Sequence, residues 1–222
     1  DRIVHVPNGI HTHRLSPPAD RVAARRSVGL SCDRPMIVFV GFFSPDKQPR
    51  VLFGAWLQLS ESMQTTLVFV GAIRSPYFEV DNEIAAEMER IATDRGLREH
   101  LVFTGPTHQV PEYLRAADAF VLPSRREGLP LALLEAMSCG LPAIASRLPG
   151  STDTIIEDGV NGLLVPPADV ASLTAAVSGV LADTARARSL GKEARETVLR
   201  RFSGIDIADR WLDAYRLLPL HG

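Results

Sequence analysis

Two glutamates whose spacing could support chemistry lie in the segment EGLPLALLE, where seven residues separate Glu127 from Glu135. Glu127 follows the strand-like run FVLPS. Glu135 lies within 131–141, where the other residues are apolar or small. An ionised carboxylate in such surroundings is costly unless it is paired. Glu135 therefore either meets a basic partner inside the protein or faces a cleft where hydroxyl groups of a ligand can donate hydrogen bonds to it.

A short helix is expected between Pro130 and Gly140. Proline suits the first helical position because its missing N–H would be unpaired there, and glycine suits the position just past the end. The pattern predicts an almost wholly apolar, buried helix of roughly ten residues, with Glu127 just outside its N-terminus. Free N–H groups and the helix dipole make that terminus a site for an anion such as a diphosphate. An anion site between two carboxylates suggests a nucleoside-diphosphate sugar as the ligand.

A glycine and a lysine earlier in the chain form a second candidate phosphate site. Gly41 follows the apolar run Met36–Val40, and Lys47 comes six residues later, in a loop before a helical pattern. A glycine after a strand lets a phosphate approach the backbone, and the lysine supplies positive charge. The alternative is that Lys47 is an ordinary solvated lysine.

Two other functions fit the sequence less well. Glycoside hydrolysis also uses two carboxylates, but both must flank one glycosidic bond. Glu135 lies on a buried helix, below a glycine turn suited to phosphate, and is poorly placed for that role. Dinucleotide-dependent oxidation and reduction are disfavoured because no G-x-G-x-x-G follows the first strand.

Short apolar runs alternate with helical patterns along the chain. Their starts lie roughly 20–35 residues apart, which leaves room for crossover helices but is too long for hairpins. The runs are continuously apolar, which favours a parallel sheet covered on both faces. The sequence predicts a doubly wound, Rossmann-like α/β sheet with its ligand at the carboxyl ends of the strands. The expected strands are Met36–Val40, Leu67–Val70, Leu101–Thr104, Ala119–Leu122, Ala143–Ala145 and Leu163–Val165, with a short edge strand at 3–6.

Two or three helices should follow the last strand. The first should begin after Asp169, a suitable N-cap residue. Its apolar stripe at helical spacing consists of Val170, Leu173, Val177, Val180 and Leu181.

The composition is that of a globular protein, with 45% apolar and 23% charged residues, and 222 residues fit one domain. The 24 lysines and arginines nearly balance the 26 aspartates and glutamates, so nucleic acid is not indicated as a partner. Two cysteines are too few for a disulfide framework, which suits a cytoplasmic protein. No apolar run reaches the length of a membrane span, and no signal peptide or initiator methionine opens the chain. It reads as an excised piece of a longer protein.

The segment around the two glutamates resembles the donor-site signature of retaining glycosyltransferases of the GT-B fold, especially family 4. The resemblance lies in the E-x7-E spacing and in the flanking VLPS and AMSCGLPAIAS. Four further segments match the family in order: VPNGI, VFVGFFSPDKQP, LVFTGPTHQVPEYLRAADAFVLPS and EDGVNGLLVPP. The similarity runs over roughly residues 3–218, nearly the whole chain.

The resemblance implies roles for residues at the donor site. Glu135 would accept hydrogen bonds from the ribose diol, and Glu127 would contact hydroxyl groups of the donor sugar. Gly128 and Leu129 would present backbone N–H groups to the diphosphate. Lys47 and the helix N-terminus would stabilise the charge that develops on the departing diphosphate. Glu127 and Lys47 are therefore the expected catalytic residues.

The resemblance also assigns Gly41 to the phosphate loop and Val110 to a backbone contact with the nucleobase. No metal and no other cofactor is implied, because protein cations and N–H groups take the place of Mg²⁺. His11 and His13 have no acidic or cysteine companion, which makes them a weak metal motif.

This chain departs from the family pattern in the phosphate loop. The family usually has an arginine directly after the glycine, where this chain has Phe42. One of the two expected pyrophosphate cations is therefore missing. Arg125 and Arg126 could restore the charge, or they could pair with the neighbouring Glu127.

The resemblance implies that residues 1–222 are the single nucleotide-sugar-binding domain of a two-domain enzyme that transfers a sugar to an acceptor hydroxyl with retention. A glycan, lipid or small-molecule acceptor would bind an absent N-terminal domain, so this chain alone should turn over little. The expected location is cytoplasmic, with membrane association through the missing half left open. The alternatives are half of a GT-B-type epimerase or phosphorylase, and a non-catalytic nucleotide-binding α/β module.

Overall fold

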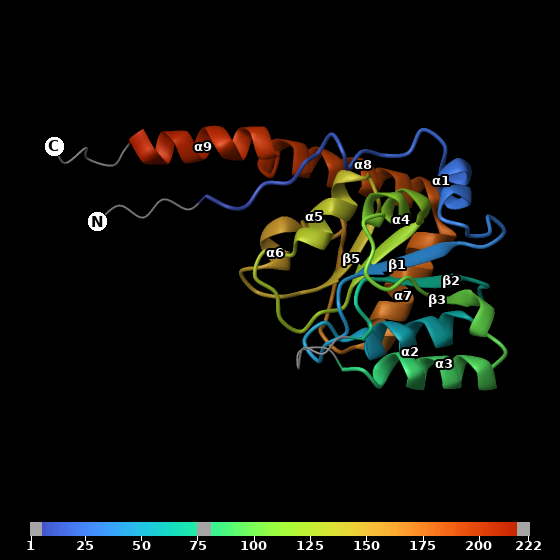
Figure 1. Ribbon diagram of the computed structural model, residues 1–222. Helices are drawn as coiled ribbons and strands as arrows, with labels where there is room; N and C mark the ends of the chain where they lie inside the picture. The colour runs from blue at the N-terminus through green and yellow to red at the C-terminus, as the bar shows by residue number, and fades with distance from the viewer. Residues whose placement is uncertain (1–5, 75–80, 217–222) are drawn as a thin grey trace.

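The computed structural model describes residues 6–74 and 81–216. Its centre is a six-stranded sheet with the order β3-β2-β1-β4-β5-β6, in which each neighbouring pair is parallel (Figure 1). This confirms the predicted doubly wound α/β sheet. The expected edge strand lies outside the described residues except for Val6, which is not in a strand. The strands are β1 (Met36–Val40), β2 (Thr66–Val70), β3 (Leu101–Phe103), β4 (Ala119–Leu122), β5 (Ala143–Ser146) and β6 (Leu163–Val165).

Helices connect these strands and cover both faces of the sheet. The first group of helices is α1 (Arg21–Ser27), α2 (Pro49–Leu59), α3 (Ile84–Asp94), the 3-10 helix η1 (Arg98–His100) and α4 (Val110–Ala116). The second group is α5 (Leu131–Ser138), α6 (Thr152–Ile155), α7 (Val170–Ala182), α8 (Thr184–Arg201) and α9 (Gly204–Arg216).

The alternation of side chains along each strand divides the core into two clusters, one on each face of the sheet. On β1, Met36 and Val38 belong to the cluster that includes α4 and α5, whereas Ile37 and Phe39 belong to the cluster that includes α2, α3 and α7. These four side chains are at most 2% exposed. The continuously apolar strands are therefore explained by burial on both faces.

The order of the strands reverses direction next to β1, which places β4 on its other side. Ile37 pairs with Ala119 and Val38 pairs with Phe120, although these residues are far apart in the chain. The loops after β1 and β4 therefore leave the sheet as neighbours at its carboxyl edge. In doubly wound sheets, ligands bind at such a switch point.

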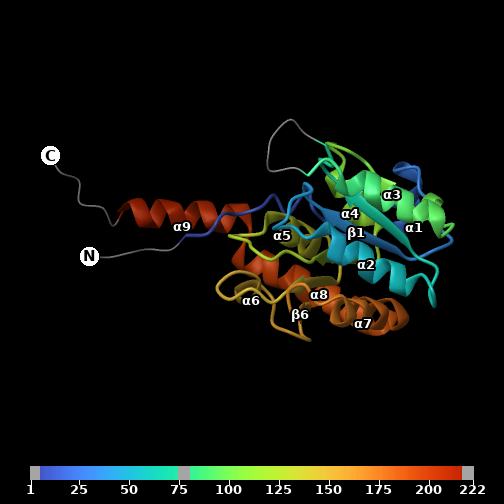
Figure 2. The same ribbon diagram turned by 90° about the horizontal axis from the view of Figure 1, so that it is seen from below.

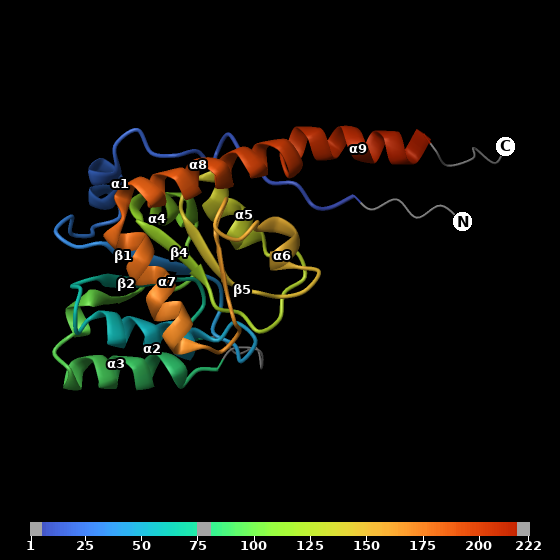
Figure 3. The same cartoon turned by 180° about the vertical axis from the view of Figure 1, so that it is seen from behind.

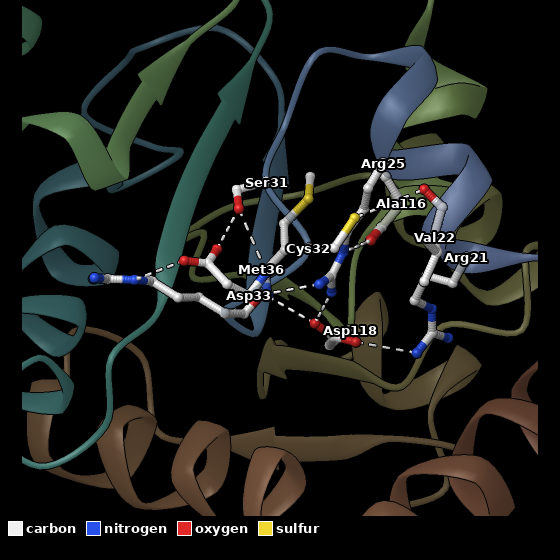
Figure 4. Close-up of polar contacts among 10 residues, drawn as sticks. Arg21, Val22, Arg25, Ser31, Cys32, Asp33, Met36, Ala116 and Asp118 are labelled. Carbon is white, nitrogen blue, oxygen red and sulfur yellow. Dashed lines mark hydrogen bonds and ion pairs between the residues drawn. The ribbon is translucent and has the colours of Figure 1, made fainter.

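At the opposite edge, a group of charged residues fixes α1 to the sheet (Figure 4). The buried guanidinium of Arg25 pairs with Asp118 and donates to the carbonyl oxygen of Ala116 over 2.9 Å. Asp118 also accepts a hydrogen bond from Met36 N over 2.7 Å and pairs with Arg21 over 3.1 Å. These contacts join α1 to the starts of β1 and β4, so they stabilise the fold far from the carboxyl edge.

The helices after the last strand begin as predicted, because the Asp169 carboxylate accepts a hydrogen bond from Ser172 N over 2.9 Å and caps α7. Helix α7 packs across the sheet, and α9 leads away from the body of the molecule (Figures 2 and 3). The start of α9 is joined to residues 6–10: Ile10 N donates to Phe202 O over 2.9 Å, and Gly204 N donates to Ile10 O over 3.0 Å. Within the described ranges, no helix combines the length and apolar character that a bilayer span requires.

Candidate functional site

The loop after β1 is held in place by the adjacent strand and by its own aromatic anchor. Phe43 is fully buried, packs edge-on against Phe69 at 4.9 Å between ring centroids, and donates from its backbone to Ala72 O over 3.0 Å. The preceding Phe42 is 38% exposed. The loop therefore turns Phe42 outward, and Lys47 lies above its ring, with Nζ 5.9 Å from the centroid.

The loop after β4 brings Glu127 to the same place. Lys47 Nζ donates to Glu127 Oε1 over 2.7 Å and to Oε2 over 2.9 Å, and Ser124 Oγ donates to Oε1 over 2.7 Å. The Glu127 side chain is only 7% exposed and that of Lys47 is 21% exposed. A shielded carboxylate of this kind requires a partner, and Lys47 supplies it.

Arg125 and Arg126, the two arginines that precede Glu127, differ in their partners. Arg125 does not pair with Glu127, because its guanidinium pairs with Asp46 over 3.4 Å and its backbone N–H donates to Asp46 O over 2.7 Å. No hydrogen bond or ion pair joins Arg126 to another described residue, and its side chain is exposed. Neither arginine pairs with Glu127, so the alternative that predicts such a pair is wrong.

Two cavities flank the Lys47–Glu127 pair. The larger, of about 540 Å³, is also lined by Phe42, Arg126 and Gly128. The smaller, of about 230 Å³, shares Phe42, Lys47 and Glu127 with it and is further lined by Gly41, Leu129, Pro130 and the first two residues of α5, Leu131 and Ala132. The predicted phosphate loop and the predicted helix N-terminus therefore both line the smaller cavity, at the carboxyl edge of the sheet.

Helix α5 differs from the prediction at its first residue. Pro130 was expected at the first helical position, but it is the N-cap residue, with an extended backbone at φ −75° and ψ 92°, and the helix begins at Leu131. At the other end, Gly140 has φ +68°, as expected for the residue just past a helix. Ser151 Oγ donates to Gly128 O over 2.7 Å, which ties the loop before α5 to the start of α6.

Glu135 is half-buried on α5, and its carboxylate has no hydrogen bond or ion pair among residues 6–74 and 81–216. Burial raises the pKa of the Glu135 carboxyl, because the ionised form loses hydration. The prediction that Glu135 meets a basic partner inside the protein is therefore not fulfilled in the described chain. The other prediction, a carboxylate available to a ligand, is compatible with this placement.

Two residues that were predicted to contact the donor lie apart from the Lys47–Glu127 pair. Glu135 and Val110 line neither cavity. Val110 begins α4 and packs against the core cluster on that face. His108, in the loop before α4, is exposed. The described part of the chain contains no group of three or more His, Cys, Asp or Glu side chains that could hold a metal ion.

The sequence predicts no role for the hydroxyl groups of Ser124 and Ser151. Ser124 is fully buried and bonded to Glu127, and Ser151 is 5% exposed and bonded to Gly128. The position of Ser124, three residues before Glu127 and directly after the strand and its proline, was the available signal. Ser151 gave no comparable signal, because its partner lies 23 residues away.

Residues 20–197 match the family described as glycosyl transferases group 1. The chain is 35% identical over 206 residues to the GDP-mannose-dependent alpha-(1-6)-phosphatidylinositol monomannoside mannosyltransferase of Mycolicibacterium smegmatis, covering 88% of this chain and 51% of that protein. It is also 35% identical over 190 residues to the D-inositol 3-phosphate glycosyltransferase of Geodermatophilus obscurus, covering 82% of this chain and 40% of that protein. The chain thus spans about half the length, or less, of these curated relatives.

Solved structures of glycosyltransferases have a fold similar to that of this chain. The structure of sucrose-phosphate synthase from Thermosynechococcus elongatus has a TM-score of 0.82 and 33% identity, covering 95% of this chain and 51% of that one. The C-terminal domain of a glycosyl transferase group 1 family protein from Francisella tularensis has a TM-score of 0.78 at 23% identity, covering 88% of this chain and 99% of that one. The chain therefore belongs to the glycosyl transferases group 1 family and has the fold of the C-terminal domain of a GT-B enzyme.

Proposed function

We propose that this chain binds a nucleoside-diphosphate sugar at the carboxyl edge between β1 and β4. The observation that carries the proposal is the Lys47–Glu127 pair, which lies between two cavities and beside the N-terminus of α5. A cation, a carboxylate and the N–H groups of a helix N-terminus can together recognise a diphosphate and sugar hydroxyls. One relative is, by its name, dependent on GDP-mannose, which is a donor of this class.

Within a longer polypeptide, the proposed reaction is transfer of the sugar to an acceptor hydroxyl with retention of the anomeric configuration. Lys47 and the N–H groups of the first turn of α5 would stabilise the negative charge that develops on the leaving diphosphate. Glu127 would accept hydrogen bonds from hydroxyl groups of the sugar, and Glu135 would accept them from the ribose. We propose no metal for this step, since the protein supplies the positive charge.

The acceptor site is proposed to lie in a separate N-terminal domain, so residues 1–222 alone should bind nucleotide with little or no turnover. A full-length protein incubated with donor and acceptor would show transfer, and NMR of the product would give the anomeric configuration. An inverted product would contradict the retaining mechanism without affecting donor binding.

Calorimetric titration of the chain with UDP, GDP, ADP and their sugar conjugates tests donor binding directly. Selective binding of one diphosphate is the expected result, and it would identify the base. Glu135→Ala should weaken that binding roughly 10- to 100-fold, because hydrogen bonds to a charged group are lost. Unchanged affinity in Glu135→Ala would remove Glu135 from the donor site. If the chain and a full-length protein bind none of these nucleotides, the proposed function is wrong.

A further inference from the structure

Phe42 leaves the larger cavity with an apolar wall at the position after Gly41. The Phe42 ring is 38% exposed and lines both cavities beside Lys47. Lys47 Nζ lies 5.9 Å from the centroid of the Phe42 ring, at the outer limit of a cation–π contact. A phosphate bound here would receive no charge from position 42.

The charged groups that line the two cavities nearly all have partners in this structure. They are Asp46, Lys47, Arg126 and Glu127. Lys47 is bonded to both oxygens of Glu127, and Asp46 is paired with Arg125. Arg126 differs from the other three, because none of the described residues forms a hydrogen bond or ion pair with it.

The two adjacent arginines are therefore not equivalent. Arg125 is held by Asp46 through both its guanidinium and its backbone N–H, and it does not line either cavity. Arg126 lines the larger cavity together with Lys47 and Gly128. A guanidinium can bind phosphate oxygens with two parallel hydrogen bonds and stays charged at any physiological pH.

We propose that Arg126 supplies the second diphosphate cation of this chain and compensates, from the loop after β4, for the phenylalanine at position 42. The inference rests on the proposed donor site and adds to it a residue that determines affinity for the phosphates. Lys47 is shared with Glu127, and the four charges lining the cavities sum to zero. Arg126 is thus the cation whose charge no neighbouring carboxylate has already neutralised.

The test compares the variants Arg126→Gln and Arg125→Gln with the parent chain. The nucleobase is the one whose diphosphate binds the parent chain most tightly in the calorimetric titration. Each protein is then titrated with the nucleoside, the monophosphate and the diphosphate of that base. We expect Arg126→Gln to lose roughly 10- to 100-fold in diphosphate affinity, with nucleoside affinity unchanged within about twofold. The matched control Arg125→Gln should keep diphosphate affinity within about threefold. The difference between Arg126→Gln and the parent chain should also shrink at high salt.

A second variant tests whether a cation at position 42 can replace Arg126. In the double variant Phe42→Arg/Arg126→Gln, a guanidinium at position 42 should recover at least part of the lost diphosphate affinity. Equal diphosphate affinity in Arg126→Gln and Arg125→Gln would overturn the inference. So would a nucleoside affinity that falls as much as that of the diphosphate, because that pattern indicates a structural role. Circular dichroism and melting temperatures establish that each variant is folded.

Failure of this inference can be separated from failure of the proposed function. If the parent chain binds a diphosphate, Glu135→Ala weakens that binding and Arg126→Gln does not, then the donor site stands and the role of Arg126 is wrong. If no nucleotide binds to the chain or to a full-length protein, the donor site itself is wrong.

Discussion

Lys47 Nζ lies 2.7 Å from one oxygen of Glu127 and 2.9 Å from the other, although the two residues are 80 positions apart in the chain. The pair joins the loop after β1 to the loop after β4 across the point where the strand order reverses. The lysine proposed for the diphosphate is thus paired with the carboxylate proposed for the sugar. A bound diphosphate would compete with Glu127 for the same ammonium group.

The Lys47–Glu127 pair should also stabilise the fold. Lys47→Ala leaves a carboxylate that is 7% exposed with Ser124 as its remaining partner, so we expect a loss of roughly 2–3 kcal/mol in the free energy of unfolding. Urea unfolding measures this loss. The double variant Lys47→Ala/Glu127→Ala should recover much of it, because no buried charge is left unpaired. Additive losses in the double variant would show that the pair is not coupled.

Glu135 should make the protein less stable as the pH rises. Its pKa in the folded state is raised by burial, so ionisation costs stability as the pH rises from the ordinary value near 4.5 through the folded value. Glu135→Gln removes this cost, and the variant should unfold at higher urea concentrations than the parent chain at pH 7. The gain should shrink as the pH falls from the folded pKa towards 4.5, and it should be absent below that value. A variant that is less stable at pH 7 would contradict the prediction.

Gly71 should be essential for the close approach of β1 and β2 at the edge that carries the phosphate loop. It has φ +130°, and a Cβ there would lie 2.3 Å from Gly41 O. Gly71→Ala should therefore cost roughly 3 kcal/mol of stability, measured as a fall in melting temperature. At the matched position Gly128, an added Cβ meets no atom within 4 Å, so Gly128→Ala should cost less than about 1 kcal/mol.

Asp118 should stabilise the amino edge of the sheet through the contacts shown in Figure 4. Asp118→Asn removes the charge that faces the buried guanidinium of Arg25, so we expect a loss of roughly 3 kcal/mol in unfolding experiments. Asp33→Asn is the control, because that carboxylate is 65% exposed and lies 3.8 Å from Arg34. Asp33 also accepts a hydrogen bond from Ser31 Oγ, which an asparagine oxygen can still accept, so its loss should be much smaller than that of Asp118→Asn. Equal losses in both variants would mean that the Arg25–Asp118 pair adds no stability.

The sequence by itself determined the six strands, the buried helix after Glu127 and the cap at Asp169. These features depend on short-range patterns: continuous apolar runs, turn residues and a carboxylate within reach of the next backbone N–H groups. The same patterns placed Gly41 and Glu127 just past strand ends. They missed the start of α5 by one residue, because the extended backbone of Pro130 makes it the cap rather than the first helical residue.

Only the tertiary structure decided which of these loops meet. The position of β4 beside β1 depends on pairing between residues that are far apart in the chain, and no local pattern encodes it. That adjacency pairs Lys47 with Glu127 and Arg125 with Asp46, and it leaves Arg126 facing the cavity without a partner among the described residues. The sequence alone left the partners of these arginines open, because an ion pair depends on distances in space between residues that are about 80 positions apart along the chain.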